Sequence, residues 1–432
     1  MKQHNSFFSQ RRPQSWSRLD NAAKIFPPTS SARDSKVFRF ACELTEPVDP
    51  VCLQAALEAT VAQFPFYRCA LRKGFFWYYL EQRDFVPQAE EEDEPPCSML
   101  YRGDGGDPLF RVTYYRRRIN LEVYHALADG TGALHFLRVL VYHYLAAAHP
   151  DEYAGLPPID YDASATQKMD DSFLKYYCRE QKDAPAAGPQ AYHLHGATLP
   201  DYRLSIIEGR TPVAPLLAQA HAHGATLTVF LVAVMIQAIH SQMSLREERR
   251  PVVVTVPVNL RNYFPSATAR NFFSVVNVGY DFSAGSGELD DIIAKVNRDL
   301  ESELTADRLA RRMNRLAHLE HMMLLRVVPL FLKIPVLRLS NRISEREITA
   351  SFSNLGKIAM PPAMCSRIRL FDVFFTTRRL QACMSSFGGS FVLTFTTPFV
   401  ATDVQRSFFR ALAALGLDVT VTSNLAEFEE AN

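Results

Sequence analysis

A histidine, an aspartate and a glycine at fixed spacing stand out in the first half of the chain. They are His125, Asp129 and Gly130, within the stretch Tyr124-His-Ala-Leu-Ala-Asp-Gly130. An imidazole with its ordinary pKa of about 6.5 can take up and return a proton at neutral pH. This H-x-x-x-D-G set therefore predicts a general base held beside a turn. Taken alone, the motif also fits a packed core histidine, so the rest of the chain has to decide between the two.

The hydrophobic period changes at the motif itself. Apolar residues and the histidine alternate with other residues before it, at positions Ile119, Leu121, Val123 and His125. That period of two is typical of a strand. From 132 to 148 the apolar residues fall at helical spacing, and Asp129 or Thr131 can cap this helix. Gly130 and Gly132 would let the chain turn tightly and approach a ligand closely. The sequence thus predicts strand, turn and helix, with His125 at the strand end.

Length and composition exclude several classes of protein. With 432 residues, 47% of them hydrophobic, the chain can bury a large core in two domains or one large pseudo-symmetric unit. A net charge of +1 does not favour nucleic acid as a partner. Seven scattered cysteines without C-x-x-C spacing argue against a disulfide framework or a zinc ribbon. No signal peptide and no transmembrane stretch of about 20 apolar residues is found, so we expect a cytoplasmic protein.

Strands and helices interleave along the whole chain, which predicts an α/β fold. We expect strands near 37–44, 69–71, 75–80, 109–115, 118–125, 202–208, 251–257, 346–353, 366–376, 380–386 and 390–397, and a loop at 89–96. Helices are expected near 50–64, 132–148, 212–223, 228–241, 287–303, 306–325 and 403–415. The apolar segment 322–339 is expected to form a packed helix pair, with membrane-surface contact or an apolar acceptor entrance as the alternatives. The Pro- and Gly-bearing stretch 183–189 predicts a boundary near 190. Neither a phosphate loop nor a G-x-G-x-x-G follows any strand, so ATP and NAD chemistry lack support.

Three separated segments resemble the CoA-dependent acyltransferase superfamily, which includes chloramphenicol acetyltransferase, alcohol acetyltransferases and the condensation domains of nonribosomal peptide synthetases. The motif at 125–130 is similar to the active-site motif of the family. The segments 257–273 and 353–362 are similar to later family segments. The stretches 19–26 and 223–231 look like the bacterial alcohol acetyltransferase-like branch. One departure is Tyr124, which stands where many relatives have a first histidine and is expected to point away from His125.

The resemblance implies two similar lobes, each a mixed β-sheet flanked by helices, with an active-site tunnel between them. Residues 1–190 would form the N-terminal lobe with the motif, and 191–432 the C-terminal lobe that completes the tunnel. The family implies acyl transfer from acyl-CoA, used as a co-substrate with no tightly bound cofactor, to an alcohol or amine. His125 would be the general base in a direct ternary complex. Asp129 would hold the catalytic loop through an ion pair with Arg261, and Gly130 would form the turn.

Other candidate residues and functions stay open at this point. Tunnel or oxyanion candidates are Asn271, Ser353, Asn354 and Thr396, although Ser-Asn before Gly is also ordinary turn chemistry. The pairs His193/His195 and His221/His223 lack a nearby third ligand, so no metal site is predicted. An acyl carrier protein is an alternative thioester donor, as in condensation-type enzymes. A non-catalytic ligand-binding or scaffold module of the same fold is the other alternative.

Overall fold

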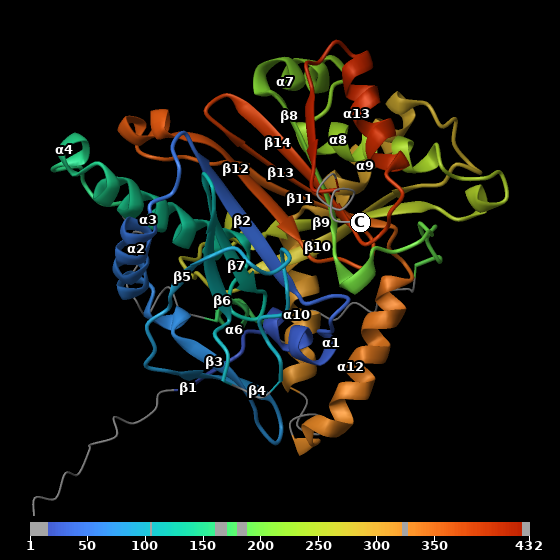
Figure 1. Ribbon diagram of the computed structural model, residues 1–432. Coiled ribbons are helices and arrows are strands. Elements are labelled where there is room, and N and C mark those ends of the chain that lie inside the picture. Colours follow the sequence, from blue (N-terminus) through green and yellow to red (C-terminus); the bar gives the residue numbers. More distant parts are fainter. Residues whose placement is uncertain (1–15, 104–105, 160–170, 179–187, 322–326, 426–432) are drawn as a thin grey trace, which may run out of the picture.

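Two mixed sheets form the framework, and a smaller sheet extends the first of them (Figure 1). The computed structural model describes residues 16–103, 106–159, 171–178, 188–321 and 327–425, and only the backbone of 315–321. The five-stranded sheet has the order β12-β2-β7-β6-β5, and the seven-stranded sheet has the order β10-β9-β11-β13-β14-β8-β15. Parallel pairs (β5 with β6, β11 with β9 and β13) stand among antiparallel ones, so both large sheets are mixed. The predicted α/β class and two-lobed architecture are confirmed.

The strands have the following bounds. In the five-stranded sheet they are β2 Val37–Leu44, β5 Ala89–Glu91, β6 Phe110–Tyr115, β7 Arg118–Tyr124 and β12 Ile368–Phe375. In the seven-stranded sheet they are β8 Ser205–Pro212, β9 Val252–Asn259, β10 Phe273–Tyr280, β11 Ala350–Lys357, β13 Leu380–Phe387, β14 Ser390–Thr397 and β15 Thr420–Ser423. The small sheet, in the order β1-β4-β3, contains β1 Trp16–Arg18, β3 Cys69–Lys73 and β4 Tyr78–Gln82.

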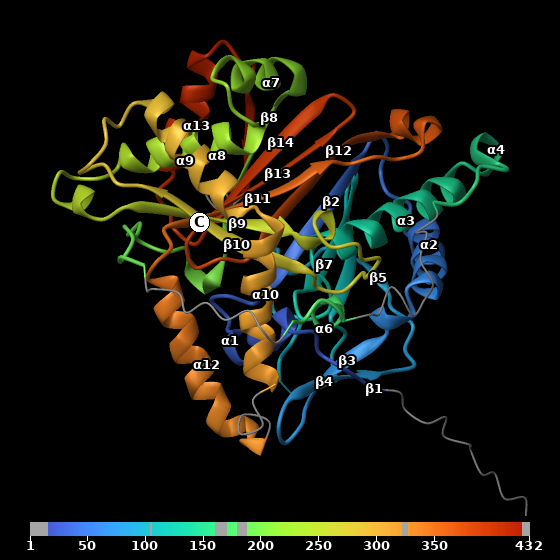
Figure 2. The same ribbon diagram turned by 180° about the vertical axis from the view of Figure 1, so that it is seen from behind.

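Helices cover the sheets from outside. They are α1 Phe26–Thr29, α2 Pro50–Gln63, α3 Gly130–Ala148, α4 Pro150–Tyr153, α6 Ser172–Lys175, α7 Val213–Ala222, α8 Leu227–His240, α9 Leu289–Glu303, α10 Ala306–His321, α12 Leu330–Glu345 and α13 Asp403–Ala414. Helices α2 and α3 pack together beside the five-stranded sheet, while α8, α9 and α13 lie on the seven-stranded sheet (Figure 2). Each sheet and its helices share a buried apolar cluster. These two clusters are the cores of the two lobes.

The seven-stranded sheet contains elements that the hydrophobic pattern did not reveal. The strands β10 and β15 were not predicted, and β5 lies in the stretch expected to be a loop. Both β10 and β15 are outer strands of their sheet. In β10 only Val276, Val278 and Tyr280 are buried, so its alternation is weak. The expected linker at 183–189 and the end of the helix expected at 306–325 fall largely outside the described residues.

A strand from late in the chain completes the first sheet. Strand β12 pairs antiparallel with β2, in a register that sets Phe375 opposite Phe38. An ion pair also connects the two large sheets. Arg118 of β7 lies 3.0 Å from Glu208 of β8 in the other sheet, and 2.9 Å from Glu43 in its own sheet. A division into 1–190 and 191–432 stays a prediction, and the first sheet includes residues from both sides of that boundary.

None of the described helices is by itself both long and apolar enough to cross a bilayer. Helices α7 and α8 together meet the requirements of length and composition, but they are bent by 80° where they meet. The side chains of α8 from Val229 to Ile236 are all buried in the core of the second lobe, which explains the apolar sequence of this helix.

Candidate functional site

His125 lies directly after the last residue of β7, at the point predicted from the sequence. Its backbone N–H donates to the carbonyl oxygen of Lys36 at 2.8 Å, which prolongs the pairing with the chain before β2. Tyr124 points to the other side, where its hydroxyl lies 2.9 Å from Ser30 Oγ. The His125 side chain remains partly accessible. A strand end thus holds the imidazole in a fixed orientation without sealing it.

Four phenylalanine rings surround the imidazole. Phe26 of α1 stacks on it with ring centroids 4.4 Å apart, and Phe38, Phe273 and Phe375 lie at 5.2, 5.3 and 5.6 Å. They come from α1, β2, β10 and β12, so both lobes contribute. Removal of water by these neighbours lowers the pKa of His125 below its ordinary value. The neutral form, which is the form able to accept a proton, is therefore favoured at pH 7.

Asn271 determines which nitrogen of His125 carries the proton. Its side-chain nitrogen donates to the carbonyl oxygen of His125 at 3.0 Å and to Asp20 Oδ2 at 3.2 Å. Its oxygen, which can only accept, lies 3.0 Å from His125 Nδ1. This pattern requires a proton on Nδ1 and leaves the lone pair of Nε2 available. Asn271 is buried, so it supports the imidazole from behind.

Asp20 extends this network and was not among the predicted site residues. It is fully buried, accepts from the N–H of Ala23 at 2.7 Å and lies 3.6 Å from Arg270 Nε. Burial raises its pKa to about 6, in spite of the opposing arginine. Asp20 holds Asn271, which in turn holds His125. The only signal for it in the sequence was its place in the family-like stretch 19–26.

Asp129 and Arg261 are brought together as expected from the resemblance. Asp129 precedes α3 as its N-cap and accepts from the N–H of Gly132 at 2.9 Å. Arg261 Nη1 lies 2.8 Å from Asp129 Oδ2, and the N–H of Phe272 donates to the same oxygen at 2.9 Å. Arg261 also donates to the backbone oxygens of Thr268 and Arg270. This nearly buried ion pair ties the start of α3 to the segment after β9.

The two motif glycines stand at the start of a helix. Neither has a positive φ, and both lie in the first turn of α3. A Cβ on Gly132 would lie 1.9 Å from the carbonyl oxygen of Ala269, whereas a Cβ on Gly130 would meet only the side-chain tip of Leu355, at 3.2 Å. The close approach at Gly132 is thus to the backbone of the second half of the chain. The expected approach of a ligand at these glycines stays a prediction, and at Gly132 the structure adds a close helix-to-backbone contact.

We expect Gly132→Ala to destabilise the protein by about 3 kcal/mol, the upper range for an overpacked site, because a backbone oxygen cannot give way easily. Gly130→Ala is the matched control, since the Leu355 side chain can rotate and alanine favours a helix. Its effect should stay within about 1 kcal/mol. Urea unfolding followed by circular dichroism measures both. Equal stability of the two variants would contradict this account.

The other three tunnel candidates have hydrogen-bond partners of their own. Asn354 is exposed, donates to Thr228 Oγ1 at 2.9 Å and accepts from the N–H of Gly356 at 2.7 Å, which is ordinary turn chemistry. Ser353 Oγ accepts from Gln381 at 3.2 Å. Thr396 is buried and donates to the carbonyl oxygen of Phe375 at 3.0 Å. Of these three, Thr396 is thereby linked to the surroundings of His125, through the backbone of a ring that flanks it.

The histidine pairs have local roles. His223 Nδ1 lies 2.7 Å from Asp290, and His193 Nε2 lies 3.2 Å from the carbonyl oxygen of Arg346. Within the described part of the chain, no three His, Cys, Asp or Glu residues gather as a metal site would require.

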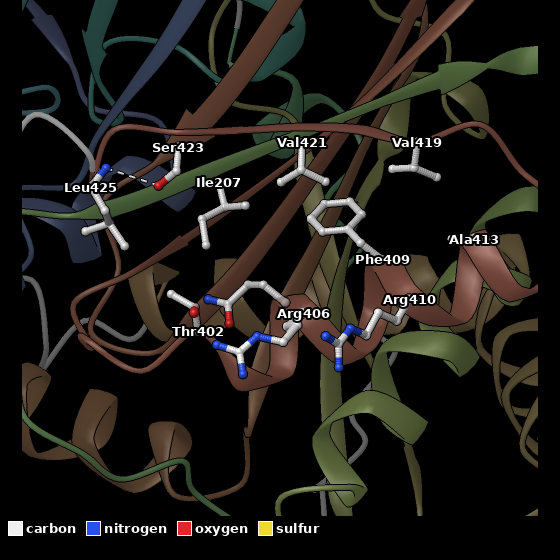
Figure 3. A pocket seen from close by; sticks show the side chains of 11 residues that line it. Ile207, Thr402, Arg406, Phe409, Arg410, Ala413, Val419, Val421, Ser423 and Leu425 are labelled. Carbon is white, nitrogen blue, oxygen red and sulfur yellow. Dashed lines mark hydrogen bonds between the residues drawn. The ribbon is translucent and has the colours of Figure 1, made fainter.

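A hollow of about 410 Å³ lies on the seven-stranded sheet, between α13 and β15 (Figure 3). Its walls are mostly apolar, with Ile207, Phe409 and Val421 among them, and Arg406 and Arg410 also line it. None of the predicted site residues takes part in it. It is therefore separate from the cluster around His125.

We compared the sequence and the fold of this chain with those of known proteins. No family model and no curated protein matches the sequence. The first condensation domain of the CDA synthetase is 15% identical, with a TM-score of 0.59 over 94% of this chain and 97% of its own. TRI101 of F. graminearum, solved with coenzyme A and deoxynivalenol, is 11% identical, with a TM-score of 0.62 over 91% of this chain and 96% of its own. TRI3 trichothecene 15-O-acetyltransferase of Fusarium sporotrichioides is 10% identical, with a TM-score of 0.59 over 93% and 95%.

At these identities the likeness concerns the fold, and it extends over nearly the full length of each chain. The resemblance predicted from the three sequence segments is thereby confirmed at the level of structure. The chain has the two-lobed fold that these acetyltransferase and condensation-domain structures share.

Proposed function

We propose that this protein is an acyltransferase that moves an acyl group from an acyl-CoA thioester to an alcohol or amine. The observation that carries the proposal is the orientation of His125, whose Nδ1 is held by Asn271 so that Nε2 is left to accept a proton. The fold supports it, since TRI101 was solved with coenzyme A and TRI3 is an acetyltransferase.

In the proposed reaction His125 Nε2 takes the proton of the acceptor hydroxyl or amine as that group attacks the thioester carbonyl. A tetrahedral intermediate forms with its charge on the former carbonyl oxygen. Its collapse breaks the carbon–sulfur bond, and the thiolate leaves with the proton returned by Nε2. The ester or amide and free CoA are the products. No acyl-enzyme is needed. Asp129 takes no part in the proton transfer and acts by holding the start of α3 in position.

The test is acceptor-dependent release of free thiol by the purified protein. Acyl-CoAs of short, medium and long chain are each offered with mixed alcohols and amines, and products are identified by mass spectrometry. Transfer that requires both substrates supports the proposal. Transfer only from an acyl carrier protein would show that the donor is a carrier-bound thioester and not acyl-CoA. The likeness to a condensation domain favours this alternative donor. No transfer from either donor would favour a non-catalytic module.

The pH dependence should follow from the lowered pKa of His125. Protonation removes the base, so kcat/KM should be level near neutrality and fall only below about pH 6.5, the ordinary pKa of histidine. Asn271→Ala should move this acid-side fall of kcat/KM, the acid limb of the pH profile, to still lower pH. The reason is that a hydrogen bond that favours the imidazolium form of His125 is lost. Its plateau should fall roughly tenfold, since the ring is no longer held in place.

Asn120→Ala is the control for that variant, because Asn120 is also buried but donates to Glu92, just after β5, at 3.1 Å. It should leave the limb where it is. If both asparagine variants gave the same pH profile as the wild type, the role assigned to Asn271 would be wrong.

A further inference from the structure

An unusually apolar surface follows the outer side of α12. Of the eighteen exposed large apolar side chains in the described chain, eight lie on α12, just before it, or on the adjacent β3–β4 turn. The remaining ten are scattered, as single exposed apolar residues normally are. Figures 1 and 2 both show α12 (orange) at the edge of the molecule, beside α1 and the end of β4.

The exposed residues form a stripe along the helix. Leu332, Val336, Leu339 and Ile343 are spaced four, three and four residues apart, so they share one face of a helix. Their exposures range from 49 to 66%. The opposite face carries the packing, with Leu330 and Lys333 buried. Part of the helix pair expected within 322–339 lies outside the described residues, and the helix that is described, α12, packs on one side only.

An apolar tip continues the stripe at the N-terminal end of α12. Phe75, Val327 and Phe331 are 67, 65 and 61% exposed. The N–H of Leu330 donates to the carbonyl oxygen of Phe75 at 2.8 Å, which fixes the turn against the helix. Lys333 Nζ lies 3.8 Å from the centre of the Trp77 ring and fastens the same contact.

The orientation of α12 is fixed by the body of the protein. Arg338 Nε donates to the carbonyl oxygen of Pro28 in α1 at 2.7 Å, and Ile334 packs against the first core. The stripe is thus a rigid outward surface. Its exposure is not explained by any contact that the described residues make with it.

The exposed charges along this surface are mostly positive. Arg338 and Arg342 are exposed and Lys333 is buried, while the only carboxylate of α12, Glu345, is its last residue and accepts from Asn341 Nδ2 at 2.6 Å. At 100° per residue, Arg338 and Arg342 flank the stripe on one side, while Ser340 and Ser344 flank the other. A helix with an apolar face and a basic flank is suited to lie at the boundary between lipid headgroups and acyl chains.

We propose that the outer face of α12, together with the 75–77 turn, binds the surface of an anionic lipid membrane. The aliphatic stripe and the phenylalanines would enter the acyl boundary, and the arginines would meet phosphate groups. Charge decides against a second copy of this chain as the occupant. A twofold pairing brings the same patch against itself, and α12 has only one carboxylate, Glu345 at its last position, to set against the exposed Arg338 and Arg342. The proposal does not depend on acyl transfer.

Vesicle co-sedimentation of the full chain tests it. The probes are vesicles of phosphatidylcholine with phosphatidylglycerol, and vesicles of phosphatidylcholine alone. The wild type should bind the mixed vesicles, and salt should weaken the binding. The double variant Leu339→Glu, Ile343→Glu should lower the affinity for mixed vesicles by about tenfold or more, because two charges replace apolar side chains that would enter the membrane. Arg342→Glu should weaken binding to the vesicles that contain phosphatidylglycerol and should leave binding to the pure phosphatidylcholine vesicles unchanged.

Leu245→Glu is the matched control, since Leu245 is 86% exposed and lies in the segment between α8 and β9, outside the stripe on α12. It should bind as the wild type does, and all variants should keep the wild-type melting temperature because the replaced side chains are exposed. Three results would overturn the proposal. These are no binding to mixed vesicles, equal binding by the double variant, and a wild-type dimer in light scattering that the double variant converts to a monomer. Thiol release with water-soluble acceptors should be unchanged in every variant, which separates this test from that of the proposed reaction.

Discussion

Replacing His125 by alanine is expected to lower kcat/KM for acyl transfer by about a thousandfold, within the usual range for loss of a general base. The folded state should lose little. Alanine leaves the Oδ1 of Asn271 without its donor, and one such hydrogen bond contributes about 1 kcal/mol. The loss of activity is measured as thiol release, and stability as the melting temperature of the same preparation.

His195→Ala serves as the control, because His195 is exposed and belongs to none of the contacts around His125. It should be fully active. Undiminished turnover by His125→Ala would disprove the role of His125 as the base. Loss of activity together with loss of folding would show that the stacked ring is mainly structural.

Asp129→Ala is expected to lower stability and activity together. The substitution leaves the guanidinium of Arg261 and the N–H groups of Gly132 and Phe272 without their acceptor in a nearly buried place. Breaking one half of a buried ion pair costs about 3 to 5 kcal/mol. Because the pair joins α3 to the segment that contains Asn271, its loss should also misplace His125. Urea unfolding and thiol release are measured side by side.

A second aspartate in the chain provides the comparison. Asp49 caps α2 through the N–H groups of Val51 and Cys52, but it has no arginine partner among the described residues and is exposed. Asp49→Ala should cost only about 1 kcal/mol, the ordinary value of a helix cap. Arg261→Ala should resemble Asp129→Ala, and the double variant should cost less than the sum of the two. If Asp129→Ala lost activity at full stability, Asp129 would act in the chemistry itself.

Much of the framework follows from local sequence. The period of two before His125 and the helical period after 132 predicted β7 and α3, because side chains alternate on a strand and repeat every 3.6 residues on a helix. The cap by Asp129 was also predictable, since a carboxylate before a helix has free N–H groups beside it. Strand β15 escaped notice because all four of its residues are exposed, and in β10 the buried residues alternate only from Val276 to Tyr280.

The sequence by itself thus determined a histidine at a strand end, the capped helix and, through the family resemblance, the pairing of Asp129 with Arg261. Only the tertiary structure decided that Asn271 and Asp20 hold His125, that Phe26 and Phe375 enclose it, and that Gly132 admits a backbone oxygen. The reason is physical. Hydrophobic periodicity reports which face of an element is covered. These contacts instead join residues that are 99 or more positions apart in the sequence, and whether they meet depends on how two complete sheets pack.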